Sequence, residues 1–295
     1  MLRLICVLVY IGTAWSSCVW AGISVTDARG VVVSLEHPAT RIISLAPHVT
    51  ELLFAAGAGA SIVGAMEYSD YPEEALQIPR IGSSSRLDLE RIVALKPDLI
   101  VAWQSGNAAG DIRHLEELGY AVFVTEPRRL ESIGENIKQL GELAGTAVTA
   151  TATAASYLEE LAALRAAYAG RRPVSVYFQI WNQPLMTING EHIINDIITL
   201  CGGQNVFADI GQLAPAISTE SILAKNPDVI IVPTAGGGPD SEMDSWRKWP
   251  ELKAIRQHHL YTVDRNLVAR QTPRILAGIR QVCDRLDAAR RSFDE

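Results

Sequence analysis

The chain has 295 residues, of which 48% are hydrophobic, and it carries a formal net charge of -7 with a pI near 5.5. This length and composition are typical of a globular protein with a large core and room for two domains. The acidic balance leaves no basic face for a polyphosphate, which excludes electrostatically driven nucleic-acid binding.

The amino terminus has the pattern of a secretory signal. Residues 1–3 include an arginine, residues 4–15 are mostly apolar, and a small residue, Ala21, ends the segment. The apolar run is too short to span a bilayer stably. We predict a signal peptide over residues 1–21 and a secreted mature protein. Lipidation of Cys18 is disfavoured because the residues just before it are not aliphatic.

Two cysteines, Cys201 and Cys283, remain after removal of the signal. In an oxidising compartment an even number of thiols usually pairs, so one disulfide is the simplest arrangement. The alternative is two buried free thiols.

Strand and helix patterns alternate along the mature chain. A hairpin is expected over residues 23–35, followed by short apolar runs that indicate strands and amphipathic runs that indicate helices. Thr50 or the residues just before it are expected to cap the first helix, after a loop at 46–48. The expected strands are 41–45, 63–65, 99–103 and 120–124, and the expected helices are 50–56, 89–95, 111–118 and 130–143.

A stretch rich in Ala, Leu and Glu, from Thr146 to Tyr168, predicts one long helix. Beyond it the alternation restarts, with elements expected over 174–180, 193–200, 222–224, 229–232, 260–263 and 274–291. We therefore predict two α/β lobes, 22–145 and 171–295, joined by a linking helix over 146–170.

An internal repeat supports this division. Residues 90–101 match residues 220–231 without a gap, with Glu, Ile, Ala, Pro, Asp and Ile recurring in register. Convergence of two helix-to-strand units is the alternative explanation, and the number of identities argues against it. Two copies indicate two similar lobes.

No catalytic motif is present. The chain lacks a Gly-x-Ser-x-Gly elbow, a Walker loop, a His-Glu-x-x-His helix and a paired-thiol metal motif, and its histidines are scattered. The sequence therefore predicts neither an enzyme nor a metal site.

Aromatic and polar residues gather in three loops, over 67–72, 102–107 and 179–184. Loops at strand ends that face a cleft between lobes hold ligand contacts. The large rings in these loops can lie flat against a rigid ring system, although packing in the core explains each one separately about as well. These rings belong to Tyr68, Tyr71, Trp103 and Trp181.

Six short strings along the mature region are distinctive. They are Arg41-Ile-Ile-Ser-Leu-Ala-Pro47, Thr50-Glu-Leu-Leu-Phe-Ala-Ala-Gly57, Tyr68-Ser-Asp-Tyr-Pro72, residues 89–98, Cys201-Gly-Gly-Gln-Asn-Val-Phe207 and Pro273-Arg-Ile275. With these strings the whole mature region resembles the cobalamin-binding periplasmic receptors of the Btu type. Several of them also mark siderophore and haem receptors, so they indicate the fold better than the ligand, whereas Tyr-Ser-Asp-Tyr-Pro followed by Ala-Trp is more specific to the cobalamin group.

The resemblance implies a class III periplasmic binding protein, in which two Rossmann-like α/β lobes joined by one long helix hold a ligand between them. It implies a periplasmic monomer that binds cobalamin or a related corrinoid and delivers it to the permease subunits of an ABC importer. No cofactor is expected, because the ligand carries its own cobalt.

The resemblance also implies roles for particular residues. Tyr68 and Trp103 match corrin-contacting aromatics, Cys201 and Cys283 match the family's disulfide, and Glu90 and Glu220 match two acids that dock on arginines of the permease. Stabilisation of a helix amino terminus is the alternative role of these acids. The second-lobe ligand loop matches Asn266, Leu267, Val268, Ala269 and Arg270.

Three departures from the family bear on the ligand. Aromatic residues that the family has near Ser84, Ala214 and Leu267 are missing, and Trp181 is a candidate substitute. Related haem receptors have a metal-ligating tyrosine just before the proline, which here is Tyr71, so haem is the nearest alternative ligand. A ferric siderophore is the other alternative within the same fold. A periplasmic chelatase or hydrolase is the alternative from another functional class.

Overall fold

The computed structural model describes residues 22–83, 86–237 and 241–293. The predicted signal peptide, Cys18 and Ser84 lie outside these residues. Within them, no helix combines the length and the hydropathy that a membrane span needs. The amino-terminal hairpin is confirmed: β1 (Ile23–Thr26) and β2 (Val32–Leu35) pair in antiparallel register.

The first lobe contains a four-stranded parallel sheet in the order β4-β3-β7-β8. Apolar runs form its central strands, which are buried because helices cover the sheet. The strands are β3 (Ile42–Ser44), β4 (Ile62–Ala65), β7 (Leu99–Trp103) and β8 (Val122–Thr125), and the helices are α1 (Pro47–Ala55), α2 (Leu89–Leu95), α3 (Ala109–Glu117) and α4 (Leu130–Leu143).

The second lobe repeats this arrangement, with a parallel sheet in the order β10-β9-β11-β12. Strands β9, β10, β11 and β12 occupy the places of β3, β4, β7 and β8, so the duplication predicted from the repeat extends to the whole sheet. The strands are β9 (Val174–Phe178), β10 (Gly203–Asn205), β11 (Val229–Thr234) and β12 (Leu260–Asp264), and the helices are α6 (Ile193–Leu200), α7 (Thr219–Lys225), α8 (Ser241–Arg247), α9 (Lys253–Arg256), α10 (Arg265–Val268) and α11 (Ile275–Ser292).

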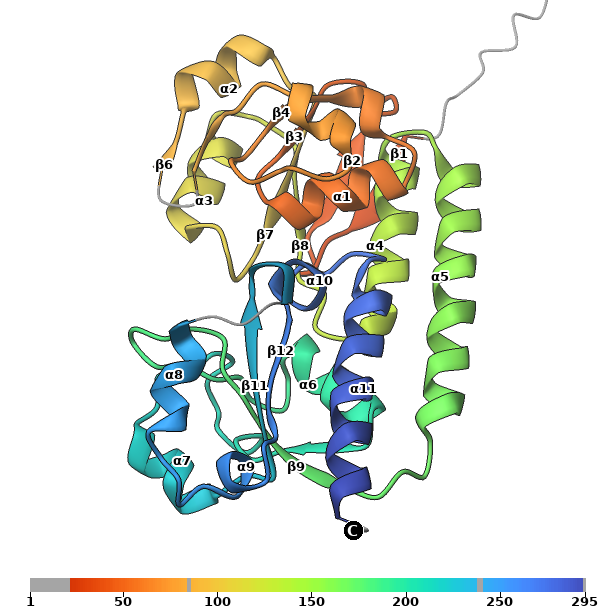
Figure 1. The fold of residues 1–295 in the computed structure, drawn as a ribbon. Coiled ribbons are helices and arrows are strands. Elements are labelled where there is room, and N and C mark those ends of the chain that lie inside the picture. Colours follow the sequence, from red (N-terminus) through yellow and green to blue (C-terminus); the bar gives the residue numbers. More distant parts are fainter. Residues whose placement is uncertain (1–21, 84–85, 238–240, 294–295) are drawn as a thin grey trace, which may run out of the picture.

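Helix α5 (Ala147–Tyr168) lies alongside both lobes in Figure 1 and joins them. The Tyr157 hydroxyl donates to the Leu130 carbonyl oxygen over 2.8 Å, which fastens α5 to α4. The predicted fold of two α/β lobes joined by one helix is confirmed. The limits given above for each lobe stay a prediction.

The repeated unit has a specific hydrogen-bonding basis in each lobe. Asp88 and Ser218 cap α2 and α7 by accepting from Arg91 N and Ser221 N. Both helices end on a left-handed residue, Lys96 at φ 47° and Asn226 at φ 43°.

The repeated Pro-Asp then connects each helix to the neighbouring strand. Asp98 accepts from Thr40 N, Thr40 Oγ1 and Arg41 N, and Asp228 accepts from Ser175 N and Ser175 Oγ. The aspartates recur because each ties the start of one strand to the start of the adjacent strand.

The start of α1 differs from the prediction. The helix begins at Pro47, and Ala46 occupies the cap position without a side-chain hydrogen bond. Proline fits the first turn because its missing N–H would have no partner there. Thr50 lies inside the helix, and its buried hydroxyl bonds Ser44 Oγ over 2.8 Å and Ser69 Oγ over 3.0 Å.

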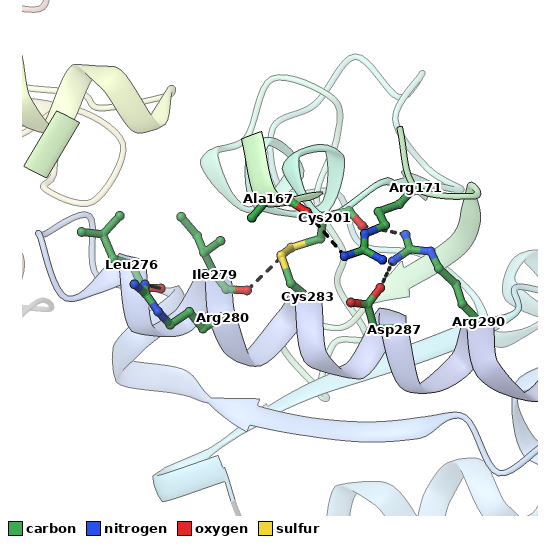
Figure 2. Close-up of a disulfide and its surroundings, with 9 residues drawn as sticks. All are labelled: Ala167, Arg171, Cys201, Leu276, Ile279, Arg280, Cys283, Asp287 and Arg290. Atoms are coloured by element: carbon green, nitrogen blue, oxygen red, sulfur yellow. Dashed lines mark hydrogen bonds and ion pairs between the residues drawn. A yellow bond between two sulfur atoms is a disulfide. The ribbon is translucent and has the colours of Figure 1, made fainter. Parts of the chain in front are cut away.

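A disulfide joins Cys201, after α6, to Cys283 in α11 (Figure 2), which confirms the predicted pair. Both cysteines are fully buried. Arg290 strengthens the same junction, since its guanidinium donates to the Cys201 and Arg172 carbonyl oxygens and pairs with Asp287 at 2.6 Å. The carboxyl-terminal helix is thus fixed to the second lobe.

Candidate ligand-binding site

The carboxyl ends of the two parallel sheets face the middle of the molecule (Figure 1). In parallel α/β sheets, ligands bind outside these strand ends. A cavity of about 100 Å³ lies at the first-lobe ends, mostly lined by apolar surface. It is lined by Leu45, Ala46, Pro47, Met66, Glu67, Tyr68, Trp103, Gly106 and Asn107.

Tyr68 lies at the mouth of this cavity in an unusual backbone conformation. Its φ is 63°, a region that costs a non-glycine residue energy and is common at binding sites. The side chain is 76% exposed. The structure therefore holds an aromatic ring in solvent at a strained position, beside the cavity.

Trp103 also lines the cavity, at the end of β7, where hydrogen bonds and close packing support its loop. Asn107 Oδ1 accepts from Trp103 N over 2.7 Å, and Asn107 Nδ2 donates to the Leu45 carbonyl oxygen over 2.9 Å. A Cβ on Gly106 would lie 1.8 Å from the indole ring, so only glycine fits there. The His48 ring meets the indole edge-on at a centroid distance of 4.9 Å.

The predicted second-lobe ligand loop coincides with α10 and the residues after it. Asn266 and Ala269 are exposed, Leu267 is half-buried, and Arg270 reaches across to the first lobe. Val268 is fully buried in the core. Its side chain has no exposed surface in this arrangement of the lobes, and its place in the ligand loop stays a prediction.

Arg270 belongs to an ion-pair cluster between the lobes that the sequence did not reveal. Its Nη1 lies 2.9 Å from Glu51 Oε1 and 2.5 Å from Asp70 Oδ1, and its Nη2 donates to the Tyr68 carbonyl oxygen over 3.2 Å. Arg274 Nη1 donates to the same Glu51 oxygen over 3.2 Å. An acid inside the apolar run of α1 was the only sequence signal for this cluster.

The cluster sets the charges of its neighbours. Burial by itself raises the pKa of Asp70, but the hydrogen bond and charge of Arg270 hold that pKa below its usual value. Burial, together with the Arg270 cation, lowers the pKa of His48 to about 3. His48 is therefore neutral at any physiological pH.

Two further aromatic candidates lie outside the cavity lining. Trp181 is 56% exposed and donates from Nε1 to the Gln183 carbonyl oxygen over 2.9 Å. Tyr71 has the Arg274 guanidinium 4.0 Å above its ring, so it belongs to the interlobe junction. Tyr68 and Trp103 thus line the cavity together, whereas Trp181 and Tyr71 do not line it.

The two predicted docking acids occupy equivalent places. Glu90 and Glu220 are exposed in the first turns of α2 and α7, which lie at the outer ends of the two lobes in Figure 1. Hydrogen bonds from its own backbone N–H and from Ser218 lower the pKa of Glu220. Neither acid lines the cavity at the strand ends.

The part of the chain that the structure describes contains no group of three or more His, Cys, Asp or Glu side chains that could hold a metal ion. The candidate site presents an apolar cavity with aromatic side chains, and two arginines lie nearby in the interlobe cluster.

Comparisons with known proteins agree with this geometry. A family model described as periplasmic binding protein matches residues 42–267. The vitamin B12-binding protein of Vibrio parahaemolyticus is 34% identical over 255 residues, which cover 86% of this chain and 92% of the relative.

Solved structures show the same relationship. The crystal structure of the periplasmic vitamin B12 binding protein BtuF of Vibrio cholerae superposes with a TM-score of 0.79 at 34% identity, covering 86% of this chain and 98% of that one. The periplasmic heme-binding protein RhuT of Roseiflexus sp. RS-1 gives a TM-score of 0.75 at 25% identity, covering 85% and 99%. The chain belongs to the periplasmic binding protein family and, within it, is a relative of the vitamin B12-binding proteins.

Proposed function

We propose that this protein is the periplasmic receptor of an ABC importer and that it binds cobalamin or a closely related corrinoid. The observation that carries the proposal is the apolar cavity between Tyr68 and Trp103 at the strand ends, in a chain whose relatives are vitamin B12-binding proteins. Rings of this size supply large contact areas to a flat macrocycle. The cobalt belongs to the ligand and is carried as cargo.

The proposed mechanism is capture and release without chemistry. A cavity of about 100 Å³ is smaller than the sites that hold even drug-sized ligands. A corrinoid therefore needs the lobes to separate, with α5 as the stiff connection between them. The ring would then lie against Tyr68 and Trp103, with Arg270 and the exposed part of the second-lobe loop on its other side.

A calorimetric titration of the mature protein with cobalamin tests the proposal. We expect one-to-one binding, and Tyr68→Ala should weaken it by about 1–3 kcal/mol because the ring loses apolar contact with the corrin. Tyr168→Ala, at the far end of the linking helix, is the matched control and should leave the affinity unchanged.

Haem provides the comparison ligand. Two results together would favour haem over a corrinoid as the ligand. Cobalamin would give no heat of binding, and haem would give a Soret band that Tyr71→Phe abolishes. Hydrolysis or metal insertion during either titration would instead indicate an enzyme.

Delivery to the permease is proposed to use Glu90 and Glu220. Their equivalent, exposed positions on the outer ends of both lobes support this role, and charged rim pairs mainly set orientation and association rate. Changing both to Arg should abolish docking and uptake while cobalamin affinity stays the same. Loss of ligand affinity in a folded double variant would show that these acids belong to the ligand site and that their assignment to the docking surface is wrong.

A further inference from the structure

Glu51 is a buried acid whose partners come from the other lobe. Its side chain is only 2% exposed, and its Oε1 accepts from Arg270 and Arg274, over 200 residues further along the chain. Its second oxygen, Oε2, is buried and has no hydrogen-bond partner among the described residues. The whole charge of Glu51 is therefore balanced across the junction of the lobes.

The same junction reaches the ligand site. Arg270, which pairs with Glu51, also donates to the carbonyl oxygen of Tyr68, the residue held at a positive φ beside the cavity. Arg274, the second partner, lies over the ring of Tyr71 in the same loop. Glu51 thus fixes the two arginines that hold the loop carrying Tyr68.

The ion pairs of Glu51 with Arg270 and Arg274 exist only while the two lobes are in contact. A buried carboxylate is tolerated only where opposite charge and hydrogen bonds compensate for its lost hydration, and removing a partner is strongly destabilising. If the lobes separate, Glu51 loses both arginines at once. The arrangement in the structure, with the lobes in contact, therefore has two charge-assisted hydrogen bonds that an open arrangement lacks.

We propose that Glu51 is a positioning residue that latches the lobes together through Arg270 and Arg274 and so couples lobe closure to the conformation of the Tyr68 loop. The latch itself does not depend on which ligand binds. Its effect on ligand binding rests on the proposed corrinoid function.

The ligand-free protein provides the first test. Val93 in α2 and Ala224 in α7 are exposed on different lobes. Spin labels attached to Val93→Cys and Ala224→Cys report the distance between the lobes by pulsed electron paramagnetic resonance. Glu51→Gln should convert one narrow distance distribution into a broader one with longer distances. An unchanged distribution in folded Glu51→Gln overturns the latch.

A matched control separates the latch from interlobe ion pairs in general. Arg128 and Glu191 also pair across the lobes, at 3.3 Å, but both side chains are largely exposed. Glu191→Gln should leave the distance distribution unchanged, because an exposed pair contributes little. Broadening by Glu191→Gln equal to that by Glu51→Gln would overturn a specific role for Glu51.

Amide hydrogen exchange of a second variant tests the latch from the other lobe. It also keeps the proposal testable if Glu51→Gln does not fold. Arg274→Gln changes the second lobe only, yet it should speed exchange in α1 and the Tyr68 loop of the first lobe. Exchange altered only around residue 274 would show a local role and would contradict the latch.

Cobalamin association gives the readout that depends on the ligand. Glu51→Gln should speed cobalamin association by about tenfold, because the latch holds together the lobes that a corrinoid needs apart. If wild type binds no cobalamin, the proposed function fails while the ligand-free measurements still decide the latch. If wild type binds and Glu51→Gln leaves the association rate unchanged, the coupling to the ligand site is wrong.

Discussion

The two lobes share a framework and differ in what they attach to it. Both have the same strand order, a capped helix with Glu in its first turn, a left-handed helix end and an aspartate that ties two strands together. At the strand ends the likeness stops. The first lobe forms the cavity with Tyr68 and Trp103, whereas the second contributes Arg270 and Arg274.

This difference shows which parts of a duplicated lobe are constrained. The helix-to-strand unit recurs because its hydrogen bonds are local and are needed wherever that unit occurs. The loops at the strand ends are free of that constraint, since the framework does not use them, and they carry the binding groups. Variants at equivalent positions of the two lobes test this view.

The largest expected effect comes from the disulfide, which exists only in the second lobe. Replacing Cys201 and Cys283 with Ala should lower the free energy of unfolding by about 4 kcal/mol in the chain-entropy model. Urea unfolding without reductant measures it. Hydrogen exchange should speed mainly in the second lobe, and equal acceleration in both lobes would contradict a lobe-specific role.

The next effect depends on pH and on one histidine in each lobe. Burial lowers the pKa of His48 to about 3 and that of His192 to about 4, from an ordinary value of 6.5. Below pH 6.5 the unfolded chain binds protons that the folded chain does not, so stability falls as the pH falls from there towards these values.

Wild type should lose about 3 kcal/mol of unfolding free energy through His48 between pH 6.5 and about pH 4.5, because each pH unit in this window costs about 1.4 kcal/mol. His48→Phe should not show this loss. Chemical unfolding at a series of pH values measures the slope. His114→Phe, at a half-exposed histidine, is the control. A slope that does not change in His48→Phe would show that His48 is protonated in the folded protein.

The repeated aspartates should have similar effects in the two lobes. Asp98→Ala removes three hydrogen bonds to residues 40 and 41, and Asp228→Ala removes the bonds to Ser175. We expect each to lower the free energy of unfolding by about 2 kcal/mol. The effects should add, since the sites lie in different lobes. A loss confined to one lobe would break the equivalence of the two units.

The smallest effect concerns the left-handed helix ends. Lys96→Gly should stabilise the protein by about 1 kcal/mol, because glycine adopts a positive φ without steric cost. Asn226→Gly should give no gain, since asparagine tolerates this conformation and its Oδ1 accepts from Lys253 N over 2.9 Å. Thermal unfolding of both variants measures the difference. Equal gains would mean that the Asn226 hydrogen bond contributes nothing.

The sequence alone determined the framework of this protein. Periodic or local patterns predict the buried strands, the amphipathic helices, the long linking helix and the repeat over 90–101 and 220–231. Each of these patterns depends on residues that are close together in the sequence. Short elements such as β10 and α10 escaped prediction because three or four residues are too few to show a period. The start of α1 was misplaced because Thr50 has the chemistry of a cap, while the structure uses its hydroxyl inside the core.

Only the tertiary structure decided how the site is assembled. It showed the cavity that Tyr68 and Trp103 line, buried the side chain of Val268 in the core, left Trp181 out of the cavity lining, and paired Glu51 with Arg270 across 219 positions of sequence. No local pattern specifies such a pair, because an acid in an apolar helix is stable only beside charges that the fold brings to it. Closure of the two lobes supplies those charges.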